Sequence, residues 1–409
     1  MERKSFDPAF TGMLNGLRVI DLSRVVAGNM VTLQLADHGA DVIKIEPLPH
    51  GDPLRAWKEG GYSAYWKVYA RNKRSLGLNF RAEGASDLIR ELAAKGDVLV
   101  EGFRPGTLEK MGLAPDTLLA QNPDLIIVRV SGFGQTGPYS PRPGFGTLVE
   151  AMSGFASRTG FEDREPVLPP LALADMIAGL YGAFATVTAV RARERGEAPG
   201  QVIDLSLLEP IISILGPEAA AYTATGRIKP RVGSGSNTAS PRNVYKTRDD
   251  KWIALSGSVQ AMAERVFRLV GREDMIDDPR YKDNTSRVKH REEVDAIVGG
   301  WVAKQTREEA LKAFADASVT AAPVYDIAGL IDDPHVVGRG IFEEVPDEEL
   351  GWVQMHAPVP RLSATPAGYR CPAPRVGEHT WEVLRELSFD ASRIAALRDA
   401  GIVGGEEAP

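Results

Sequence analysis

Strand-like and helix-like stretches alternate along the first half of this 409-residue chain. Leu17–Leu22 (LRVIDL) and Ala40–Glu46 (ADVIKIE) are short apolar runs typical of buried strands, and Asn29–Asp37 between them has helical spacing. Further strand-like runs follow at Asp97–Glu101, Asp124–Val130 and Gln201–Leu205. Because strands that alternate with helices usually pair in parallel, we predict an α/β fold in which helices cover a parallel sheet.

The composition changes at Gly226–Asn243, which reads GRIKPRVGSGSNTASPRN and is rich in Gly, Ser and Pro. Two short strands are expected around and beyond its end, at Val244–Lys246 and Trp252–Leu255. Helical spacing then recurs at Gln260–Val270, Arg291–Lys304 and Arg307–Ala317. We predict a large α/β domain from residues 1–225 and a smaller α+β domain at 226–330. Residues 331–409 should return to the large domain, because they are too short to form a core alone.

The overall charge and the cysteine content exclude several classes of protein. The chain carries 55 acidic and 48 basic side chains, a formal net charge of −7, so its surface as a whole disfavours nucleic acid. The single cysteine, Cys371, excludes an intramolecular disulfide and fits a reducing compartment. We expect no run to be long and apolar enough to span a bilayer, since the apolar segment near Leu207–Leu215 is interrupted by Glu209 and Pro210. We expect a cytoplasmic protein that binds neither nucleic acid nor a membrane.

One segment imitates a dinucleotide-binding turn. Gly132–Gly137 reads GFGQTG and matches the G-x-G-x-x-G pattern. That pattern works only where a helix begins at its end and directs its N-terminus at the pyrophosphate. Prolines at 138, 141 and 143 prevent such a helix. We therefore predict no nucleotide redox cofactor.

Metal and hydrolase signals are absent from the sequence. The six histidines form no H-x-x-x-H pair and have no cysteine partner at metal-ligand spacing. No G-x-S-x-G elbow occurs. We predict no bound metal and no serine-hydrolase chemistry.

A single acidic residue stands in an otherwise uncharged segment. Pro169–Phe184 reads PPLALADMIAGLYGAF, in which Asp175 is the only charged side chain. Helical spacing places the start of a helix near residue 175, so Asp175 could serve simply as an N-cap. The alternative is a catalytic carboxylate, because an ionised carboxylate in apolar surroundings is costly unless it is paired or used. The segment alone leaves both readings open.

Basic residues gather around and after the predicted strands. Positions just beyond the carboxyl ends of parallel strands are where such sheets bind ligands. Several cations in these positions on a net acidic protein indicate a small, multiply phosphorylated ligand. The residues concerned are Arg71, Lys73, Arg74, Arg81, Arg104, Lys110 and Arg142.

Six segments taken together resemble successive signature blocks of the class III CoA-transferases, the formyl-CoA and carnitine CoA-transferase type. They read GLRVIDLSRVVAG, HGADVIKIEPLPHGDPLR, RNKRSLGLNF, VEGFRPGTLEKMG, VSGFGQTGP and LADMIAGLYGA, and the resemblance runs in order from about Leu17 to Leu205. No single block is specific, but the ordered set is. The resemblance implies a Rossmann-like large domain built from both chain ends and an interlocked homodimer. The long connectors near residues 206–243 and 318–350 would thread the partner.

The resemblance also implies a catalytic residue and a coenzyme A site. Asp175 would be the nucleophile, acting on an acyl-CoA and a carboxylic acid as substrates. The implied CoA-binding residues are Val26, Ala27, Leu78, Asn79, Phe80, Arg81, Gly102, Phe103, Arg104, Lys110, Arg142 and Phe145.

The implied chemistry is a transfer of CoA between two acids. A carboxylate attacks an acyl-CoA, and mixed anhydrides and an aspartyl-CoA thioester carry CoA from a donor such as succinyl-CoA to an acceptor acid. Each step exchanges bonds of similar reactivity, so neither ATP nor a metal nor a redox cofactor is required. Two alternatives are an acyl-CoA racemase of the same fold and a CoA-binding protein without catalysis. The racemases that this fold resembles use a histidine–aspartate pair, with the histidine before the aspartate, yet no histidine occurs here between His50 and His290.

Two segments depart from the pattern of many relatives. Where these have a His-Pro segment followed by Pro-Tyr, the chain reads GSNTASPRNVY, with Arg242 in place of the tyrosine. We expect Ser236, Asn237 and Arg242 to contact the acyl substrates, with Arg242 clamping the distal carboxylate of a C4–C6 dicarboxylic acid. A solvated connector arginine is the alternative. Leu255–Gln260 (LSGSVQ) stands where formyl-transfer members have a closing run of glycines, so oxalate and formate are disfavoured as substrates.

Overall fold

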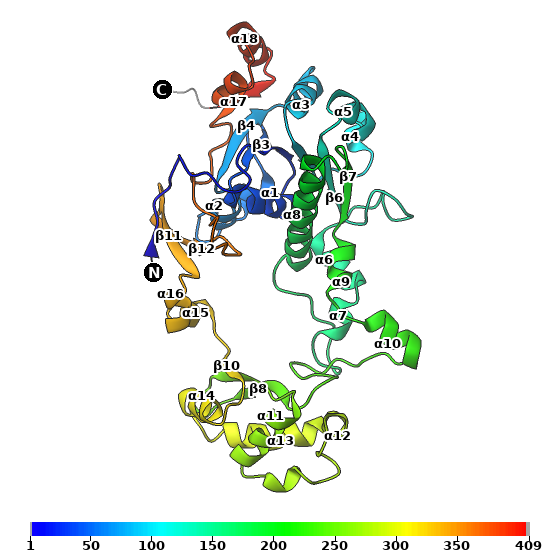
Figure 1. The fold of residues 1–409 in the computed structure, drawn as a ribbon, viewed down its shortest axis with the longest axis vertical. Coiled ribbons are helices and arrows are strands. Elements are labelled where there is room, and N and C mark those ends of the chain that lie inside the picture. Colours follow the sequence, from blue (N-terminus) through cyan, green and yellow to red (C-terminus); the bar gives the residue numbers. More distant parts are fainter. Residues whose placement is uncertain (1, 406–409) are drawn as a thin grey trace. The chain divides into compact units, whose positions relative to one another are not determined.

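The computed structural model describes residues 2–405, which form two compact units (Figure 1). Unit 1 is built from three parts of the chain: one that ends at Ser153, one from Pro169 to Gly216, and one that resumes at Val337. Unit 2 is built from Gly154–Leu168 and Pro217–Val336. The segment Gly154–Leu168 therefore leaves unit 1 just before the helix that carries Asp175, although no change of composition marks it.

Unit 1 contains a seven-stranded sheet, in the order β13-β4-β3-β2-β5-β6-β7 among the described residues. All neighbouring pairs from β4 to β7 are parallel, and β13 pairs antiparallel with β4. The predicted parallel α/β sheet is therefore confirmed. The strands are β2 (Arg18–Leu22), β3 (Asp41–Pro47), β4 (Lys73–Leu78), β5 (Val98–Glu101), β6 (Ile126–Ser131), β7 (Val202–Ser206) and β13 (Val403–Gly404).

The two faces of this sheet pack differently, because alternate side chains of a strand point to opposite sides. On one face, Ile20 and Leu76 join an apolar cluster with α3 (Ala85–Ala93), α17 (Thr380–Glu386) and α18 (Ala391–Asp399). On the other face, Asp21 of β2 accepts a hydrogen bond from Thr32 of α1 (Ala27–Asp37). The first face is a conventional apolar core, and the second contains buried polar groups.

Helix α8 (Leu173–Glu194) packs closely against α1. A Cβ atom at Gly179 would crowd Met30, and one at Gly182 would crowd Val31, so glycine at these two positions permits the close approach. The carbonyl oxygen of Ala27 also faces Gly179. The beginning of α1 is thereby held against the second and third turns of α8.

The expectation that no stretch is long and apolar enough for a membrane span is wrong for α8. By its length of 22 residues and its apolar composition alone, this helix could cross a membrane, and 44% of its most apolar 18-residue stretch is buried inside the structure. Length and composition are weak evidence here, because core helices of soluble proteins satisfy the same test. Its packing on α1 accounts for the buried part of this helix, while Leu180, Phe184 and Val187 are exposed.

Unit 2 has a three-stranded antiparallel sheet in the order β10-β9-β8. Its inner face, which includes Tyr245 and Ile253, packs on helices through residues such as Phe267 and Val298. The strands are β8 (Arg242–Lys246), β9 (Trp252–Ser256) and β10 (Ala321–Pro323). The helices are α11 (Gln260–Leu269), α12 (Asn284–Lys289), α13 (Arg291–Val302) and α14 (Arg307–Asp316).

The remaining elements are short and connect or flank the two sheets. A second sheet in unit 1 has the order β1-β11-β12, from Glu2–Arg3, Phe342–Asp347 and Gly351–His356. The other α-helices are α2 (Ala64–Tyr69), α4 (Thr107–Lys110), α5 (Pro115–Gln121), α6 (Gly146–Met152), α7 (Phe155–Arg158), α9 (Leu208–Ser213), α10 (Glu218–Thr225), α15 (Ile327–Ile331) and α16 (Pro334–Gly338).

Candidate functional site

Asp175 is the third residue of α8 and is partly buried. The N-cap position is held by Ala172, and no side chain caps this helix. The capping interpretation of Asp175 is therefore wrong. The carboxylate nevertheless lies in the first helical turn, where free backbone N–H groups favour negative charge.

Gly146, the first residue of α6, lies directly against this carboxylate. A Cβ atom built at Gly146 would overlap Oδ2 of Asp175. The backbone N–H of Gly146 also contributes hydrogen bonding that favours the ionised form of Asp175. The approach of backbone to carboxylate thus depends on the missing side chain.

Glu150 lies one turn further along α6, on the same helix face as Gly146. Its side chain is buried, and Oε1 accepts a hydrogen bond of 3.0 Å from the backbone N–H of Ala174. Burial, together with the negative charge of Glu150, raises the pKa of Asp175 to about 6. Sequence reasoning missed Glu150, because a lone glutamate in a short helix gives no signal before the fold brings it to α8.

Val26 and Ala27 lie at the turn from β2 into α1. Val26 occupies the N-cap position and Ala27 the first position of the helix, and both are buried. Val26 belongs to an apolar cluster against which Ala172 and Met176 pack, the residues on either side of the Asp175 turn. The structure therefore joins this predicted CoA-binding turn to the start of α8.

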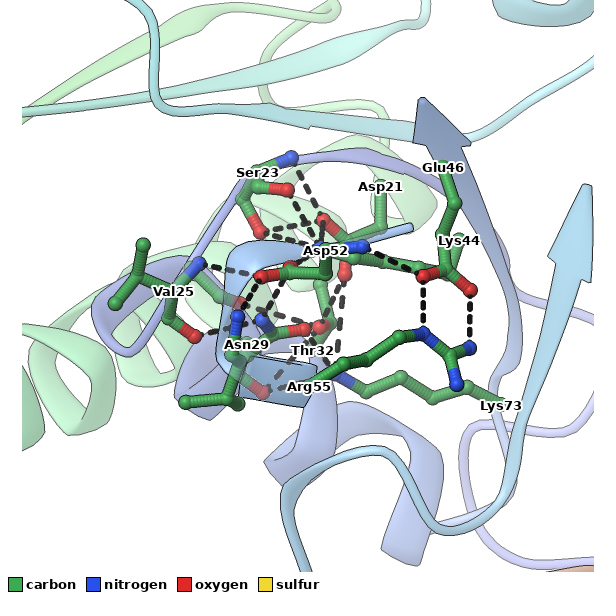
Figure 2. Close-up of polar contacts among 12 residues, drawn as sticks. Asp21, Ser23, Val25, Asn29, Thr32, Lys44, Glu46, Asp52, Arg55 and Lys73 are labelled. Carbon is green, nitrogen blue, oxygen red and sulfur yellow. Dashed lines mark hydrogen bonds and ion pairs between the residues drawn. The ribbon is translucent and has the colours of Figure 1, made fainter. Parts of the chain in front are cut away.

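A buried polar network lies beneath the turn (Figure 2). We call it the turn network and define it as Asp21, Asn29, Lys44, Asp52 and Lys73. Lys44 pairs with Asp52 at 3.1 Å and with Asp21 at 3.3 Å, and all three side chains are inaccessible to solvent. Asp52 in turn accepts hydrogen bonds from the turn's backbone and from Asn29. The β2–α1 turn is thus anchored from below by charged groups.

The segments after β4 and β5 meet through their aromatic residues. The rings of Phe80 and Phe103 pack edge to face with centroids 6.3 Å apart. The guanidinium of Arg24, from the β2–α1 turn, lies over both rings, 5.7 Å from Phe80 and 5.4 Å from Phe103. Gly102 is close to the same turn, since a Cβ there would lie 3.9 Å from the backbone nitrogen of Arg24. Sequence reasoning missed Arg24, which links three of the predicted loops.

The remaining predicted CoA residues lie at or beyond the ends of β4 and β5 and on the loop between β6 and α6. Leu78 ends β4 and is buried, while Asn79 contacts the backbone at Gly401 and Ile402. Phe145 is 66% exposed and precedes Gly146. Among the described residues, no carboxylate forms an ion pair with Arg24, Arg81, Arg104, Lys110 or Arg142. Arg142 instead stacks on Tyr139, 3.6 Å from the ring centroid.

Three of the grouped basic residues are occupied within the fold. Arg71 forms a buried pair with Asp37, and Lys73 donates to Asn29. Arg74 pairs with Asp41, and its exposed edge meets two glutamates of α17. The prediction that these cations face a phosphorylated ligand is not supported by their contacts.

The GFGQTG loop does not form a dinucleotide turn. No helix begins after β6 until Gly146. The N–H groups of Gly134 and Gln135 donate to Ser131 Oγ and the Asp204 carboxylate. Within residues 2–405, no three His, Cys, Asp or Glu side chains gather in a way that could hold a metal ion.

The predicted substrate residues of unit 2 separate into two groups. Ser236 bonds Thr238, and Asn237 donates to the carbonyl oxygen of Pro230. Arg242 instead lines a cavity of about 570 Å³ on the sheet of unit 2, together with Ser234, Asn243, Val244, Ala254, Leu255, Ser256, Thr320, Ala321 and Ala322. Arg242 is the one charged side chain in that described lining, and it donates at 3.3 Å to the carbonyl oxygen of Gly235. Sequence reasoning missed Ser234 and Thr320 here.

Comparison with known proteins identifies the family. The model of CoA-transferase family III matches residues 14–380. The chain belongs to this family. It is therefore a class III CoA-transferase, and the resemblance inferred from the six sequence blocks is confirmed.

Relatives of this CoA-transferase are similar over almost their whole length. Succinyl-CoA–D-citramalate CoA-transferase of Chloroflexus aurantiacus is 35% identical over 91% of this chain and 94% of its own. Human succinyl-CoA:glutarate CoA-transferase is 32% identical over 96% of this chain and 90% of its own. A crystal structure of a CAIB/BAIF family protein from Brucella suis has a TM-score of 0.80 at 32% identity, covering 93% of this chain and all of that one.

Proposed function

We propose that this class III CoA-transferase moves CoA from succinyl-CoA to a dicarboxylic acid through covalent intermediates on Asp175. The donor is supported by the names of the relatives, which pair succinyl-CoA with citramalate or glutarate. Both of those acceptors carry two carboxylates. The observation that carries the mechanism is the single carboxylate of Asp175, held against the Gly146 backbone at the start of α8.

The first half of the reaction loads CoA onto the enzyme. The Asp175 carboxylate attacks the thioester carbonyl of succinyl-CoA, and CoA leaves as a thiolate. The thiolate then attacks the aspartyl carbonyl of the mixed anhydride, which forms an aspartyl-CoA thioester and releases succinate. Atoms and electron pairs balance without another reactant.

The second half reverses these steps with a new acid. An acceptor carboxylate attacks the aspartyl-CoA thioester and gives a second mixed anhydride and CoA thiolate. The thiolate attacks the acceptor's acyl carbonyl, so the new acyl-CoA forms and the Asp175 carboxylate is restored. Both halves pass through tetrahedral oxyanions, for which backbone N–H groups such as that of Gly146 are suitable donors.

The ionisation of Asp175 suits a nucleophile. A pKa of about 6 leaves roughly ten ionised carboxylates for each protonated one at pH 7. The raised pKa also makes the carboxylate more basic than an exposed aspartate. Apolar surroundings from Val26, Ala172 and Met176 limit water, which would hydrolyse the anhydrides.

Coenzyme A would bind along the loops after β2, β4 and β5, and with the loop that follows β6. Its phosphates need cations that are not already paired, and Arg24, Arg81, Arg104 and Lys110 meet that condition among the described residues. Phe80 and Phe103 offer aromatic surface beside Arg24. Cytoplasmic localisation remains a prediction.

The second carboxylate of the acceptor would be bound by Arg242. Its guanidinium can form a bidentate pair with a carboxylate, and no carboxylate of the described chain competes for it. Ser256, directly opposite Arg242 in the β8–β9 register, adds a hydroxyl at the same cavity. Small residues such as Ala254 and Ala322 leave room for the ligand.

The decisive experiment traps the covalent intermediate. The enzyme is incubated with succinyl-CoA and hydroxylamine, and the tryptic peptides are analysed by mass spectrometry. An aspartyl-CoA thioester gives a hydroxamate at Asp175, and Asp175→Asn gives none while it still binds CoA. An acyl-CoA racemase or a non-catalytic CoA-binding protein would give no hydroxamate at Asp175 in either form, and that result would overturn the proposal.

A further inference from the structure

The β2–α1 turn contains one residue in an unfavourable backbone conformation. Val25 has φ of 63°, in the left-handed region that a β-branched residue rarely adopts. Such a conformation persists only where the surrounding structure holds it, and such positions cluster at functional sites. Val25 directly precedes Val26 and Ala27.

Both backbone polar groups of Val25 are held by buried side chains (Figure 2). Its N–H donates to Asp52 Oδ1 at 3.0 Å, and its carbonyl oxygen accepts from Asn29 Nδ2 at 2.7 Å. The same nitrogen of Asn29 donates to Asp52 Oδ2 at 2.8 Å. The two side chains that hold Val25 therefore also hold each other.

Lys73 fixes the orientation of the Asn29 amide. Its ammonium group donates to Asn29 Oδ1 and to the Asn29 carbonyl oxygen, each at 3.0 Å. The Val25 carbonyl oxygen and the Asp52 carboxylate can only accept, so the amide nitrogen faces them and the amide oxygen faces Lys73. Lys44 completes the arrangement by bonding Asp52 and the carbonyl oxygen of Ser23, just before the turn.

The turn network is better suited to fixing the backbone conformation of the β2–α1 turn than to raising the free energy of unfolding. Buried charges pay a large desolvation cost, and well-packed apolar residues often stabilise a fold as well or better. The turn network sits where that geometry matters, because the adjoining Val26 packs against Ala172 and Met176 beside Asp175.

We propose that Asn29, oriented by Lys73 and Asp52, is a positioning residue that holds Val25, and through it Val26 and Ala27, in the conformation that binds CoA. The inference rests on the CoA site of the proposed function. Asn29 is fully buried, so its side chain acts through the turn and does not touch the ligand.

The test compares Asn29→Ala with Thr32→Val. Thr32 lies on the same helix, is equally buried, and loses a hydrogen bond to Asp21 without touching Val25. Isothermal titration with CoA should show about tenfold weaker binding for Asn29→Ala and less than twofold change for Thr32→Val, even where both lower the melting temperature equally. If Asn29→Ala does not fold, Asn29→Ser replaces it, because serine is too short to reach the Val25 carbonyl oxygen.

A second substitution separates positioning from general stability. Glycine adopts positive φ without strain, so Val25→Gly added to Asn29→Ala should recover part of the CoA affinity. Unchanged CoA affinity in Asn29→Ala, equal losses in both single variants, or no recovery would each overturn the inference. Failure of the wild-type enzyme to bind CoA would instead overturn the proposed function.

Discussion

Gly146 and Asp175 are in contact so close that any side chain at residue 146 would overlap the carboxylate. The contact joins the first residue of α6 to the first turn of α8. It sets one side of the carboxylate against the backbone N–H of Gly146. The geometry therefore requires glycine at residue 146 if Asp175, the proposed nucleophile, is to keep this position.

Gly146→Ala should lower kcat by about a hundredfold or more, because the carboxylate must move from its reacting position. CoA affinity should change less than twofold. Gly300→Ala is the matched control, since a Cβ there meets nothing within 4 Å in a helix of unit 2. Steady-state kinetics and CoA titration measure both quantities, and normal turnover in Gly146→Ala would refute the close-contact requirement.

The acidic limb of the profile of activity against pH should report the ionisation of the Asp175 carboxylate. In the proposed mechanism the ionised carboxylate is the nucleophile, so kcat/KM for succinyl-CoA should fall as the pH falls through about 6. Glu150→Gln removes the negative charge that helps to raise the pKa of Asp175 and can still accept the Ala174 N–H bond. The limb should therefore move to lower pH. Titration of the substrate itself is common to both enzymes, and an unmoved limb would show that Glu150 does not tune Asp175.

Arg24→Met should weaken CoA binding about tenfold, because an unpaired cation beside two aromatic rings is lost. Arg18→Met is the control, since Arg18 lies at the opposite end of β2 and pairs with Asp41. A succinyl-pantetheine thioester, which lacks the phosphates, should lose little kcat/KM with Arg24→Met. An equal loss for both thioesters would place Arg24 outside the phosphate site.

Arg242→Lys and Arg242→Ala should each lower kcat/KM for dicarboxylate acceptors about tenfold or more, since a desolvated charge-assisted bond contributes about 1.5–3 kcal/mol. Monocarboxylate acceptors should be affected far less. Lys246→Ala is the control, because Lys246 lies on the same outward face of β8 and pairs with Asp250. A parallel loss for both acceptor classes, or no loss, would rule out the clamp.

The predicted homodimer has a candidate contact surface on α8. Leu180, Phe184 and Val187 follow one another at helical spacing and are exposed, Phe184 by 73%. Phe184→Glu should shift the protein from dimer to monomer in sedimentation equilibrium at micromolar concentration. Lys304→Glu, at an exposed position of unit 2 just after α13 and outside α8, is the control. A wild-type protein that sediments as an active monomer would contradict the prediction.

The strands that could be predicted are those that contain a short run of mostly apolar, β-branched or aliphatic residues. The predicted strands at Leu17–Leu22 and Ala40–Glu46 differ from β2 and β3 by no more than one residue at either end. β4 was not predicted, because it begins Lys-Arg-Ser and reads as a basic loop. Its Lys73 is buried in the turn network, and polar residues that are satisfied only by distant partners carry no local signal.

The residues of the candidate site were also predicted only in part. Asp175 was identified because its segment is otherwise uncharged and because the ordered blocks resemble one family. Glu150 and Arg24 were missed, since each acquires its role from residues far along the chain. The N-cap reading of Asp175 failed because the helix begins two residues earlier than its apolar spacing suggested.

Unit 1 is completed by residues from near the end of the chain: Val403 pairs with Leu78, and Val383 and Leu384 cover the apolar face behind β3 and β4. A ribosome makes all of unit 2 before these residues emerge. During synthesis the edge of β4 is therefore unpaired and one apolar face of the central sheet is uncovered, although all residues of unit 2 have already been made. A message cut short before codon 380 yields a chain that keeps Asp175 and every predicted CoA-binding residue, yet presents the surface that chaperones and proteases recognise.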